Sequence, residues 1–148
     1  MDTAFKWIEN HNGICSDDDY PYISGSGRVP FCKRCKPVPG TEIKTYVDVP
    51  HTVEDLMQAV SKQPVSIAIE ADQAAFQFYN SGVVTGVCGE KLDHGVLLVG
   101  YGTTENGIPY WKVKNSWGSS WGDHGYVLIE RSDKNLCGVL LSASYPVL

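Results

Sequence analysis

A histidine and an asparagine lie at the two ends of a predicted β-hairpin in the second half of the chain. His94 precedes one apolar run and Asn115 follows another. Leu97–Tyr101 and Tyr110–Val113 are aliphatic, β-branched or aromatic, which predicts two strands, and Thr103–Gly107 has the composition of the turn between them. In an antiparallel pair folded about this turn, partner numbers sum to about 210. The spacing therefore predicts that His94 lies level with Asn115.

An imidazole held by an amide oxygen can serve as a general base. A neutral histidine ring offers one donor and one acceptor nitrogen, and an amide oxygen determines which nitrogen carries the hydrogen. A histidine oriented in this way can activate a thiol or hydroxyl nucleophile. The alternative is a purely structural pair, because buried polar groups generally find hydrogen-bond partners. Hairpin spacing alone favours the structural alternative.

The residues around His94 and Asn115 favour the catalytic alternative over the structural one. They form the motifs Leu92-Asp93-His94-Gly95, Val99-Gly100-Tyr101-Gly102, Tyr110-Trp111 and Lys114-Asn115-Ser116-Trp117-Gly118 through Trp121-Gly122. These motifs resemble the His and Asn segments of papain-like, cathepsin L-like cysteine proteases. The resemblance extends over nearly the whole chain, from Met1–Phe5, through Asp19–Tyr22 and Gln63–Ser66, to Ser144–Pro146.

The resemblance implies an α+β fold with two lobes. Residues 1–40 are expected to be a remnant of the helical lobe, and residues 41–148 the complete antiparallel, β-barrel-like lobe that carries the His and the Asn. Two full lobes need roughly 210–220 residues, which exceeds one average domain. The 148 residues are therefore expected to be the C-terminal two-thirds of the mature domain.

The nucleophilic cysteine of the family is expected to lie outside these residues. In the family it precedes the His and Asn by about 130–150 residues, within a C-G-[SA]-C-[WY] motif. None of the five cysteines here is followed by Trp or Tyr; the residues that follow them are Ser16, Lys33, Lys36, Gly89 and Gly138. The motif would fall roughly forty residues before Met1. We therefore expect Met1 to be an internal methionine, with a native cytosolic start as the alternative.

The resemblance assigns a role to each residue of the His and Asn motifs. His94 would be the imidazole partner of a cysteine thiolate and would give its proton to the leaving amine. Asn115 would hold the orientation of the ring, and Trp117 would cover the contact between them, although plain core packing also accounts for Trp117. Asp93 would tune the local field or would simply be a solvated acid beside the cleft.

A substrate preference is also implied. Four positions match the S2 pocket of the family, which receives P2, the second substrate residue before the cleaved bond: Ala68, Leu92, Gly95 and Ser142. All four are apolar or small. The pocket is therefore expected to accept a bulky apolar or aromatic P2 side chain, because no acid at position 142 is available to pair with a basic one.

The cysteines indicate disulfides. By resemblance, Cys88 and Cys137 pair, and closing a loop of about 50 residues contributes roughly 4 kcal/mol on the chain-entropy model. Cys15 is expected to pair with Cys32 or Cys35, an addition to the family pattern. The Cys32-x-x-Cys35 spacing also occurs in zinc and redox sites, but no second C-x-x-C or clustered histidine follows at metal spacing. Disulfides indicate secretion or a lysosome-like compartment.

Composition narrows the class of partner. Hydrophobic residues make up 43% of the chain and charged residues 20%, and the formal net charge is −5. An acidic chain lacks the basic face that nucleic acid requires, and no apolar run is long enough for a membrane span. The expected partners are peptide or protein substrates and cystatin-like inhibitors or the protein's own pro-segment. No cofactor or metal is expected.

The remaining elements are predicted from periodicity and from cap and turn residues. They are a helix over Met1–Asn10, a loop over Ser24–Gly40, a strand over Glu42–Val49, a helix that begins after Thr52 and ends near Lys62, a strand over Val65–Ile69, a helical turn over Ala74–Tyr79, and strands over Gly125–Glu130 and Cys137–Leu141.

Three interpretations of function follow. The first is a cysteine-type endopeptidase that acts through an acyl-enzyme, of which this chain is a truncated fragment that is inactive alone because it lacks the nucleophile. The second is a catalytically inactive homologue or fragment that binds peptides or inhibitors. The third, a cysteine-stabilised structural domain, would leave the match of His94 and Asn115 to chance. An upstream Q-x-x-x-x-x-C-W would support the first.

Overall fold

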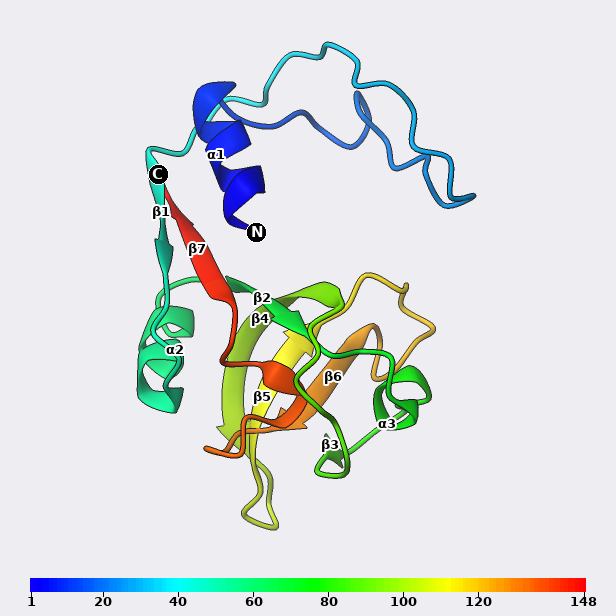
Figure 1. Ribbon diagram of the computed structural model, residues 1–148, viewed down its shortest axis with the longest axis vertical. Coiled ribbons are helices and arrows are strands. Elements are labelled where there is room, and N and C mark those ends of the chain that lie inside the picture. Colours follow the sequence, from blue (N-terminus) through cyan, green and yellow to red (C-terminus); the bar gives the residue numbers. More distant parts are fainter. The chain divides into compact units, whose positions relative to one another are not determined.

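The computed structural model describes all residues, Met1–Leu148, and divides into two compact units (Figure 1). Unit 1 comprises Met1 and Asp48–Tyr145. Unit 2 comprises Asp2–Val47 and Pro146–Leu148. The sequence motifs around His94 and Asn115 all lie in unit 1, so the site is described within that unit alone.

The chain has one open sheet. Its strands are β1 (Thr45–Asp48), β2 (Val65–Ile69), β3 (Val83–Val84), β4 (His94–Thr103), β5 (Pro109–Lys114), β6 (Tyr126–Glu130) and β7 (Ala143–Val147). Five of these strands, β2 to β6, lie wholly in unit 1. The strands are arranged in the order β1-β7-β2-β4-β5-β6-β3. The β2–β4, β2–β7, β4–β5 and β5–β6 pairs are antiparallel, and the short β3 pairs with β6 in parallel. The sheet does not close into a barrel, because β1 and β3 form its two edges.

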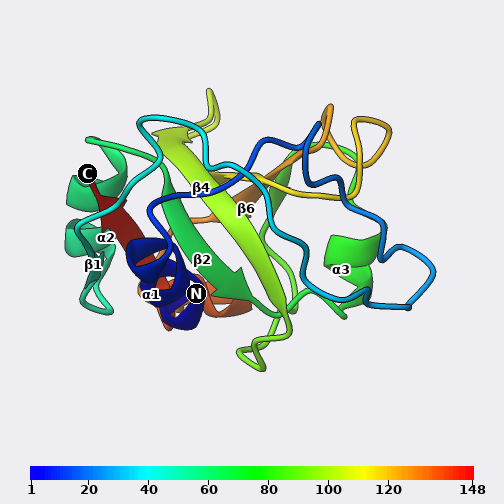
Figure 2. The same cartoon turned by 90° about the horizontal axis from the view of Figure 1, so that it is seen from above.

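The helices are few and short. They are α1 (Asp2–Asn10), α2 (Val53–Val60), α3 (Ala74–Gln77) and the single 3₁₀ turn η1 (Leu136–Gly138). Helices α2 and α3 lie at opposite sides of unit 1 in both views (Figures 1 and 2). Helix α2 begins as predicted: the Thr52 hydroxyl accepts a hydrogen bond from Asp55 N at 3.1 Å and donates one to Asp55 Oδ2 at 2.6 Å. These bonds satisfy a donor that every helix start leaves free.

The β4–β5 hairpin has the predicted register to within one or two positions. Leu97 pairs with Lys114, and an irregularity between Leu98 and Gly100 then shifts the register by one residue. A β-bulge of this kind increases the local twist and bends its strand. Gly107 has φ of 82° in the connecting turn, a conformation that glycine adopts without strain. The hairpin therefore forms as the sequence predicts.

Alternating burial along the strands builds the core of unit 1. The fully buried side chains include Val65, Ile67 and Ile69 of β2, Trp111 and Val113 of β5, Leu56 of α2 and Phe76 of α3. Burying one such side chain contributes about 1.5–3 kcal/mol. Strand β2 thus presents one face to the core, and its end is fixed by packing next to the start of β4, where His94 lies.

The prediction of a last strand over Cys137–Leu141 is wrong. Residues 136–138 form η1, and the last strand is β7. Asn135, Cys137 and Gly138 have φ of 50°, 60° and 73°, in the left-handed region that an extended strand excludes. The apolar residues of this segment are buried in the turn as they would be in a strand, so their apolar character could not distinguish the two.

The other predicted elements are present with shifted bounds. Strand β2 has the predicted bounds; β1, β6, α2 and α3 are shorter than predicted, and β4 and β5 are longer. Differences of this size arise because the ends of elements depend on tertiary hydrogen bonds that a local pattern does not encode. Each predicted element other than the last strand is therefore confirmed in type.

In unit 2, α1 is followed by a long segment without helix or strand, residues 11–44. Phe5 of α1 stacks on Tyr46, with ring centroids 5.9 Å apart. Ile14 N donates to the Thr41 hydroxyl at 3.0 Å, and Val38 N donates to Ile14 O at 2.8 Å. These contacts hold the two ends of the long loop side by side, and the Ser24–Gly40 prediction of a loop is confirmed.

No helix has both the length and the apolar composition needed to cross a lipid bilayer.

Candidate functional site

His94 and Asn115 are joined by a hydrogen bond. His94 Nε2 lies 2.8 Å from Asn115 Oδ1. His94 is the first residue of β4, and Asn115 follows the last residue of β5. The hairpin thus brings together two side chains that are 21 residues apart, as the spacing predicts. Asn115 is 7% exposed, whereas His94 is half-buried.

A third group determines which ring nitrogen carries the hydrogen. Ser116 N donates to Asn115 Oδ1 at 2.8 Å, so the amide oxygen, and not the amide nitrogen, faces this donor. The same oxygen faces His94 Nε2, which must therefore be the donor nitrogen. In a neutral ring the other nitrogen, Nδ1, is then an acceptor with a free lone pair. The arrangement prepares Nδ1 to take a proton from a nucleophile.

The Asn115 amide nitrogen has no partner. Its Nδ2 atom is buried without a hydrogen bond, and an unsatisfied buried donor costs about 1–3 kcal/mol. The oxygen of Asn115 is fully used, by His94 and by Ser116.

An aromatic cluster surrounds the imidazole. The Trp117 ring stacks on His94 with centroids 5.1 Å apart and an interplanar angle of 28°. Phe76 lies edge-on to both rings, and Trp121 contacts Phe76 and Trp117 at 5.1 Å and 5.2 Å. Stacking restricts the ring of His94 to one plane and excludes water from one of its faces. Trp117 itself remains 37% exposed.

Asp93 binds a backbone amide and not the imidazole next to it. Its Oδ1 accepts a hydrogen bond from Ala71 N at 2.8 Å, and its own N donates to Ile69 O at 3.0 Å. Both bonds tie the residue before His94 to the end of β2. Asp93 therefore holds the start of β4 next to the end of β2.

Three of the four predicted S2 residues, Ala68, Gly95 and Ser142, lie on adjacent segments, and the fourth, Leu92, lies in the loop before β4. Ala68 and Gly95 are paired residues of β2 and β4, and Ala68 N donates to Ser142 O at 2.9 Å. The side chain of Leu92 packs against Gly138, so closely that a Cβ atom added to Gly138 would collide with Leu92 Cδ2. A Cβ atom added at Gly95 would meet no heavy atom within 4 Å. The space above the Ala68–Gly95 pair is therefore open.

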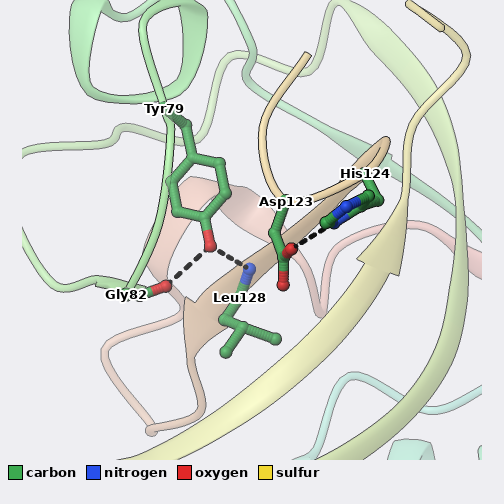
Figure 3. Close-up of polar contacts among 5 residues, drawn as sticks. All are labelled: Tyr79, Gly82, Asp123, His124 and Leu128. Carbon is green, nitrogen blue, oxygen red and sulfur yellow. Dashed lines mark hydrogen bonds and ion pairs between the residues drawn. The ribbon is translucent and has the colours of Figure 1, made fainter. Parts of the chain in front are cut away.

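Tyr79, which follows α3, is bonded to the sheet. Its hydroxyl donates to Gly82 O at 2.7 Å and accepts from Leu128 N of β6 at 3.4 Å (Figure 3). Burial raises the pKa of this phenol above its usual value of 10, and the charge of Asp123 adds to the rise, while the hydrogen bond from Leu128 opposes it. The ring also packs on Trp121 at 5.8 Å, so Tyr79 supports the cluster around His94.

The other three histidines lie on the surface, as predicted: His11, His51 and His124 are exposed. His124 Nδ1 lies 2.8 Å from Asp123 Oδ1 (Figure 3). Exposed pairs of this kind contribute little to stability.

Four of the five cysteines form disulfides. Cys88 is bonded to Cys137, and of the two partners that the sequence leaves open for Cys15, the structure selects Cys35. Cys32 keeps a free, exposed thiol, and a hydrogen bond with it raises the pKa of Tyr20. The C-x-x-C spacing therefore forms neither a metal site nor an internal redox pair in this structure.

The size of a hollow does not identify the site. Two hollows of about 770 and 430 Å³ lie among loop residues of unit 2 and contain neither His94 nor Asn115. A hollow of about 470 Å³ borders Asn115 and Gly95. The chemistry of the His94–Asn115 pair, and not the volume of the largest of these three hollows, therefore selects the candidate site.

Three contributors to the site are not predicted from the sequence. Phe76 and Trp121 complete the aromatic cluster, and the backbone of Ala71 holds Asp93. Trp121 belongs to a motif that surrounds Asn115, but nothing in its spacing indicates contact with Phe76. The Ala71–Asp93 bond joins residues 22 positions apart, and the Phe76–Trp121 contact joins residues still more distant in sequence. Local patterns do not encode either contact.

The model of the papain family of cysteine proteases matches residues 1–147. Among curated proteins, the chain is 47% identical over 152 residues to cysteine proteinase EP-B 1 of Hordeum vulgare, and 48% identical over 151 residues to vignain of Ricinus communis. Each match covers 99% of this chain and 41% of the relative. The chain thus spans about two fifths of the length of these relatives.

Solved structures have the same fold. The proform of the ragweed pollen cysteine protease Amb a 11 has a TM-score of 0.92 and 40% identity, covering 100% of this chain and 45% of that one. Bromelain from Ananas comosus, in complex with the E64 inhibitor, has a TM-score of 0.90 and 40% identity, covering 99% and 68%. The open sheet, the few helices and the His94–Asn115 pair thus occur in a chain whose sequence and fold both match one family. The chain belongs to the papain family of cysteine proteases.

Proposed function

We propose that these residues supply the histidine and asparagine of a cysteine-type endopeptidase. The observation that carries this proposal is the hydrogen bond from His94 Nε2 to Asn115 Oδ1, fixed by Ser116 N. It leaves His94 Nδ1 as an acceptor, which a thiol nucleophile needs. The family relationship supports cysteine-type peptidase chemistry.

The reaction would run through an acyl-enzyme. His94 Nδ1 takes the thiol proton, and the imidazolium stabilises the thiolate. The thiolate attacks the substrate carbonyl carbon, and the carbon–nitrogen bond breaks as His94 gives the proton to the leaving amine. His94 then takes a proton from water, whose oxygen attacks the acyl carbon. The carbon–sulfur bond breaks, the carboxylic acid product leaves, and the thiolate–imidazolium pair is restored. Asn115 holds the ring in one orientation throughout, and Trp117 shields one face of it.

The nucleophile in this proposal is a cysteine that these 148 residues do not contain. Four cysteines are disulfide-bonded, and Cys32 is followed by Lys33 where the family motif requires Trp or Tyr. The chain by itself is therefore proposed to be inactive. In the complete enzyme, residues 1–40 would belong to a helical lobe and residues 41–148 to the lobe that carries His94.

The proposed substrates are peptides and proteins with a bulky apolar or aromatic P2 side chain. Ala68, Gly95 and Ser142 are adjacent and small, and Leu92 adds an apolar side chain nearby. Such a lining favours apolar groups through the burial of their surface. Further proposed partners are a pro-segment and cystatin-like inhibitors. A solved proform of one related protease supports the pro-segment, and the E64 complex of another shows that a relative binds an inhibitor. The two disulfides favour a secreted or lysosome-like location.

A non-catalytic function remains the second candidate. The His94–Asn115 pair and the open space above Gly95 would equally suit a homologue that binds peptides or inhibitors without cleaving them. The residue that precedes Trp in the upstream motif distinguishes the two, because serine or glycine there removes the nucleophile.

The first testable prediction concerns hydrolysis. The chain alone should not cleave a peptide substrate with phenylalanine at P2, whereas a fusion to a papain-family segment that carries the C-G-[SA]-C-[WY] motif should cleave it and should be blocked by a thiol alkylator. His94→Ala in the fusion should abolish cleavage. Asn115→Ala should lower kcat/KM about tenfold, because the ring loses one orienting hydrogen bond.

Asn106→Ala, in the exposed hairpin turn, is the matched control and should leave cleavage unchanged. A fusion that folds and reacts with the alkylator but does not cleave any peptide would support the binding function. Cleavage by the 148-residue chain alone would contradict the proposal that its nucleophile lies elsewhere.

A further inference from the structure

Glu70 is a buried carboxylate beside the segment that leads to His94. It directly follows the last residue of β2 and is 4% exposed. Burying a charged group is unfavourable unless hydrogen bonds or an opposite charge offset the loss of water. The proposed reaction makes no use of Glu70, so its burial has to be explained by its contacts.

Two neutral donors bind the carboxylate. Gln73 Nε2 donates to Oε1 at 2.8 Å, and the backbone N of Lys91 donates to Oε2 at 2.9 Å. A hydrogen bond to an ionised acceptor is about twice as strong as one between neutral groups. The carboxylate of Glu70 therefore holds the backbone of Gly89–Asp93, which we call the Gly89–Asp93 loop.

The loop lies closely against Glu70. A Cβ on Gly89 would collide with Glu70 Oε2, so the loop can approach the carboxylate because position 89 has no side chain. The backbone of Glu70 also donates from N to Cys137 O at 2.9 Å. Cys137 is bonded to Cys88, at the start of the loop, so Glu70 lies between the disulfide and the loop.

Three successive residues at the end of β2 attach the loop. Ile69 O accepts from Asp93 N, Glu70 Oε2 accepts from Lys91 N, and Ala71 N donates to Asp93 Oδ1. The bond to Glu70 is the one that holds Lys91, and the other two hold Asp93. Leu92 lies between Lys91 and Asp93, so its position depends on the bond at Lys91 and on the bonds at Asp93.

We propose that Glu70 is a positioning residue that sets the P2 preference of the peptidase by holding Leu92 in place. Leu92 is the loop residue that lines the proposed S2 pocket, and His94 follows the loop directly. This inference rests on the proposed function of the same site. Glu70 does not touch substrate; it acts through the backbone of Lys91.

A carboxylate suits this position better than an amide. Glutamine at position 70 would offer one acceptor oxygen, and its amide nitrogen would face either Lys91 N or Gln73 Nε2, both of which are donors. Turning the Gln73 amide over would not relieve this, because Gln73 Nε2 also donates to Asp72 Oδ1 at 2.8 Å.

Exchanging the side chains of residues 70 and 73 restores both bonds of residue 70. Because Gln73 is also bonded to Asp72, the exchange is made together with Asp72→Asn, so that a donor and not a second carboxylate faces the new Glu at position 73. In this double variant, Glu70→Gln with Gln73→Glu in the Asp72→Asn background, the amide of residue 70 donates to the new carboxylate while its oxygen still accepts from Lys91 N.

The first measurement is amide hydrogen exchange on the 148-residue chain, which needs no peptidase activity. Glu70→Gln should accelerate exchange at Lys91 N about tenfold, because a charge-assisted hydrogen bond is lost. The double variant should return the rate to near that of the wild type. Glu105→Gln, which makes the same chemical change in the exposed hairpin turn, is the matched control and should leave Lys91 unchanged.

The second measurement is P2 selectivity in the nucleophile-bearing fusion described above. Glu70→Gln should change the ratio of kcat/KM for two substrates that differ only in leucine or phenylalanine at P2, mainly through KM. The double variant should restore the wild-type ratio. A purely structural role would lower both values of kcat/KM equally and leave the ratio unchanged.

The outcomes separate the two proposals. If Glu70→Gln accelerates exchange at Lys91 N but the fusion cleaves no peptide, the role of Glu70 is supported and the proposed peptidase function is contradicted. Active fusions with unchanged exchange and unchanged selectivity would overturn the role of Glu70 while leaving the peptidase function intact. If Glu70→Gln does not fold, the double variant decides: a folded protein with a protected Lys91 amide supports the proposal, and one that also fails to fold overturns it.

Discussion

At the scale of single residues, the site depends on acceptors whose orientation is fixed by backbone donors. Ser116 N fixes the oxygen of Asn115, and Ala71 N fixes the carboxylate of Asp93. A backbone N–H has no rotamers and does not titrate near neutral pH, so it determines the direction of a side chain more reliably than another side chain does. The ring of His94 is oriented through this second layer of contacts.

Tyr79 provides a residue-level prediction about alkaline pH. Its pKa is raised above 10 by burial, so the folded chain holds this proton more tightly than the unfolded chain. The free energy of unfolding should then fall as pH rises from about 10 through the folded-state value, because the unfolded state releases the proton first. Below pH 10 this contribution is fully present.

Tyr79→Phe should make the unfolding free energy less steeply dependent on pH above 10, and should lower stability at neutral pH because Leu128 N and Gly82 O lose their partner. Urea denaturation between pH 8 and about 11 measures both effects. Tyr22→Phe, at an exposed position, is the control. Equal slopes for Tyr79→Phe and the wild type would contradict the assigned pKa direction.

At the scale of elements, short helices and strands are held by their caps and by their packing. Helix α2 has eight residues, too few to be stable alone in water. Its hydroxyl cap at Thr52 and the buried Val53, Leu56 and Val60 stabilise it instead. Strand β2 similarly depends on its two neighbours in the sheet.

Removing the cap of α2 should therefore destabilise unit 1. Thr52→Ala leaves Asp55 N without its acceptor and should lower the free energy of unfolding by about 1 kcal/mol. Thr52→Ser keeps the hydroxyl and should stay within about 0.5 kcal/mol of the wild type. Urea unfolding followed by tryptophan fluorescence measures both. An alanine variant as stable as the serine variant would show that the cap contributes nothing.

At the scale of the whole molecule, each of the two units contains one disulfide. Cys88–Cys137 closes a long loop within unit 1, and Cys15–Cys35 a shorter one within unit 2. Cross-links restrict the unfolded chain more strongly when the closed loop is longer. Unit 2 has little regular structure, so its disulfide replaces a hydrophobic core that unit 2 does not build.

The two disulfides should act on different units. Replacing Cys88 and Cys137 with alanine should lower the stability of unit 1 by about 4 kcal/mol, and replacing Cys15 and Cys35 should lower that of unit 2 by about 3 kcal/mol. Residue-resolved hydrogen exchange measures each unit separately. The unit that keeps its disulfide serves as the internal control. Loss of protection across both units from either replacement would show that the units unfold together.

Much of the site was predictable because hairpins and capped helices are local. The Asn-Gly turn and the apolar runs around it determined the register of β4 and β5, and thereby placed His94 at Asn115. A turn of fixed length leaves only one or two possible registers. The family motifs around both residues, and the cap at Thr52, are likewise contained in the sequence itself.

The tertiary structure alone decided what lies around that pair. Cys15 pairs with Cys35 and not Cys32, the segment after Asn135 turns where an extended strand was expected, and the end of β2 meets the loop before His94. The disulfide and the contact at the end of β2 depend on residues that are distant in sequence. The turn after Asn135 depends on backbone angles that the segment adopts as its apolar side chains become buried. Local periodicity reports only which residues avoid water, so the buried carboxylate of Glu70 and its hold on Lys91 appear only when the chain is folded.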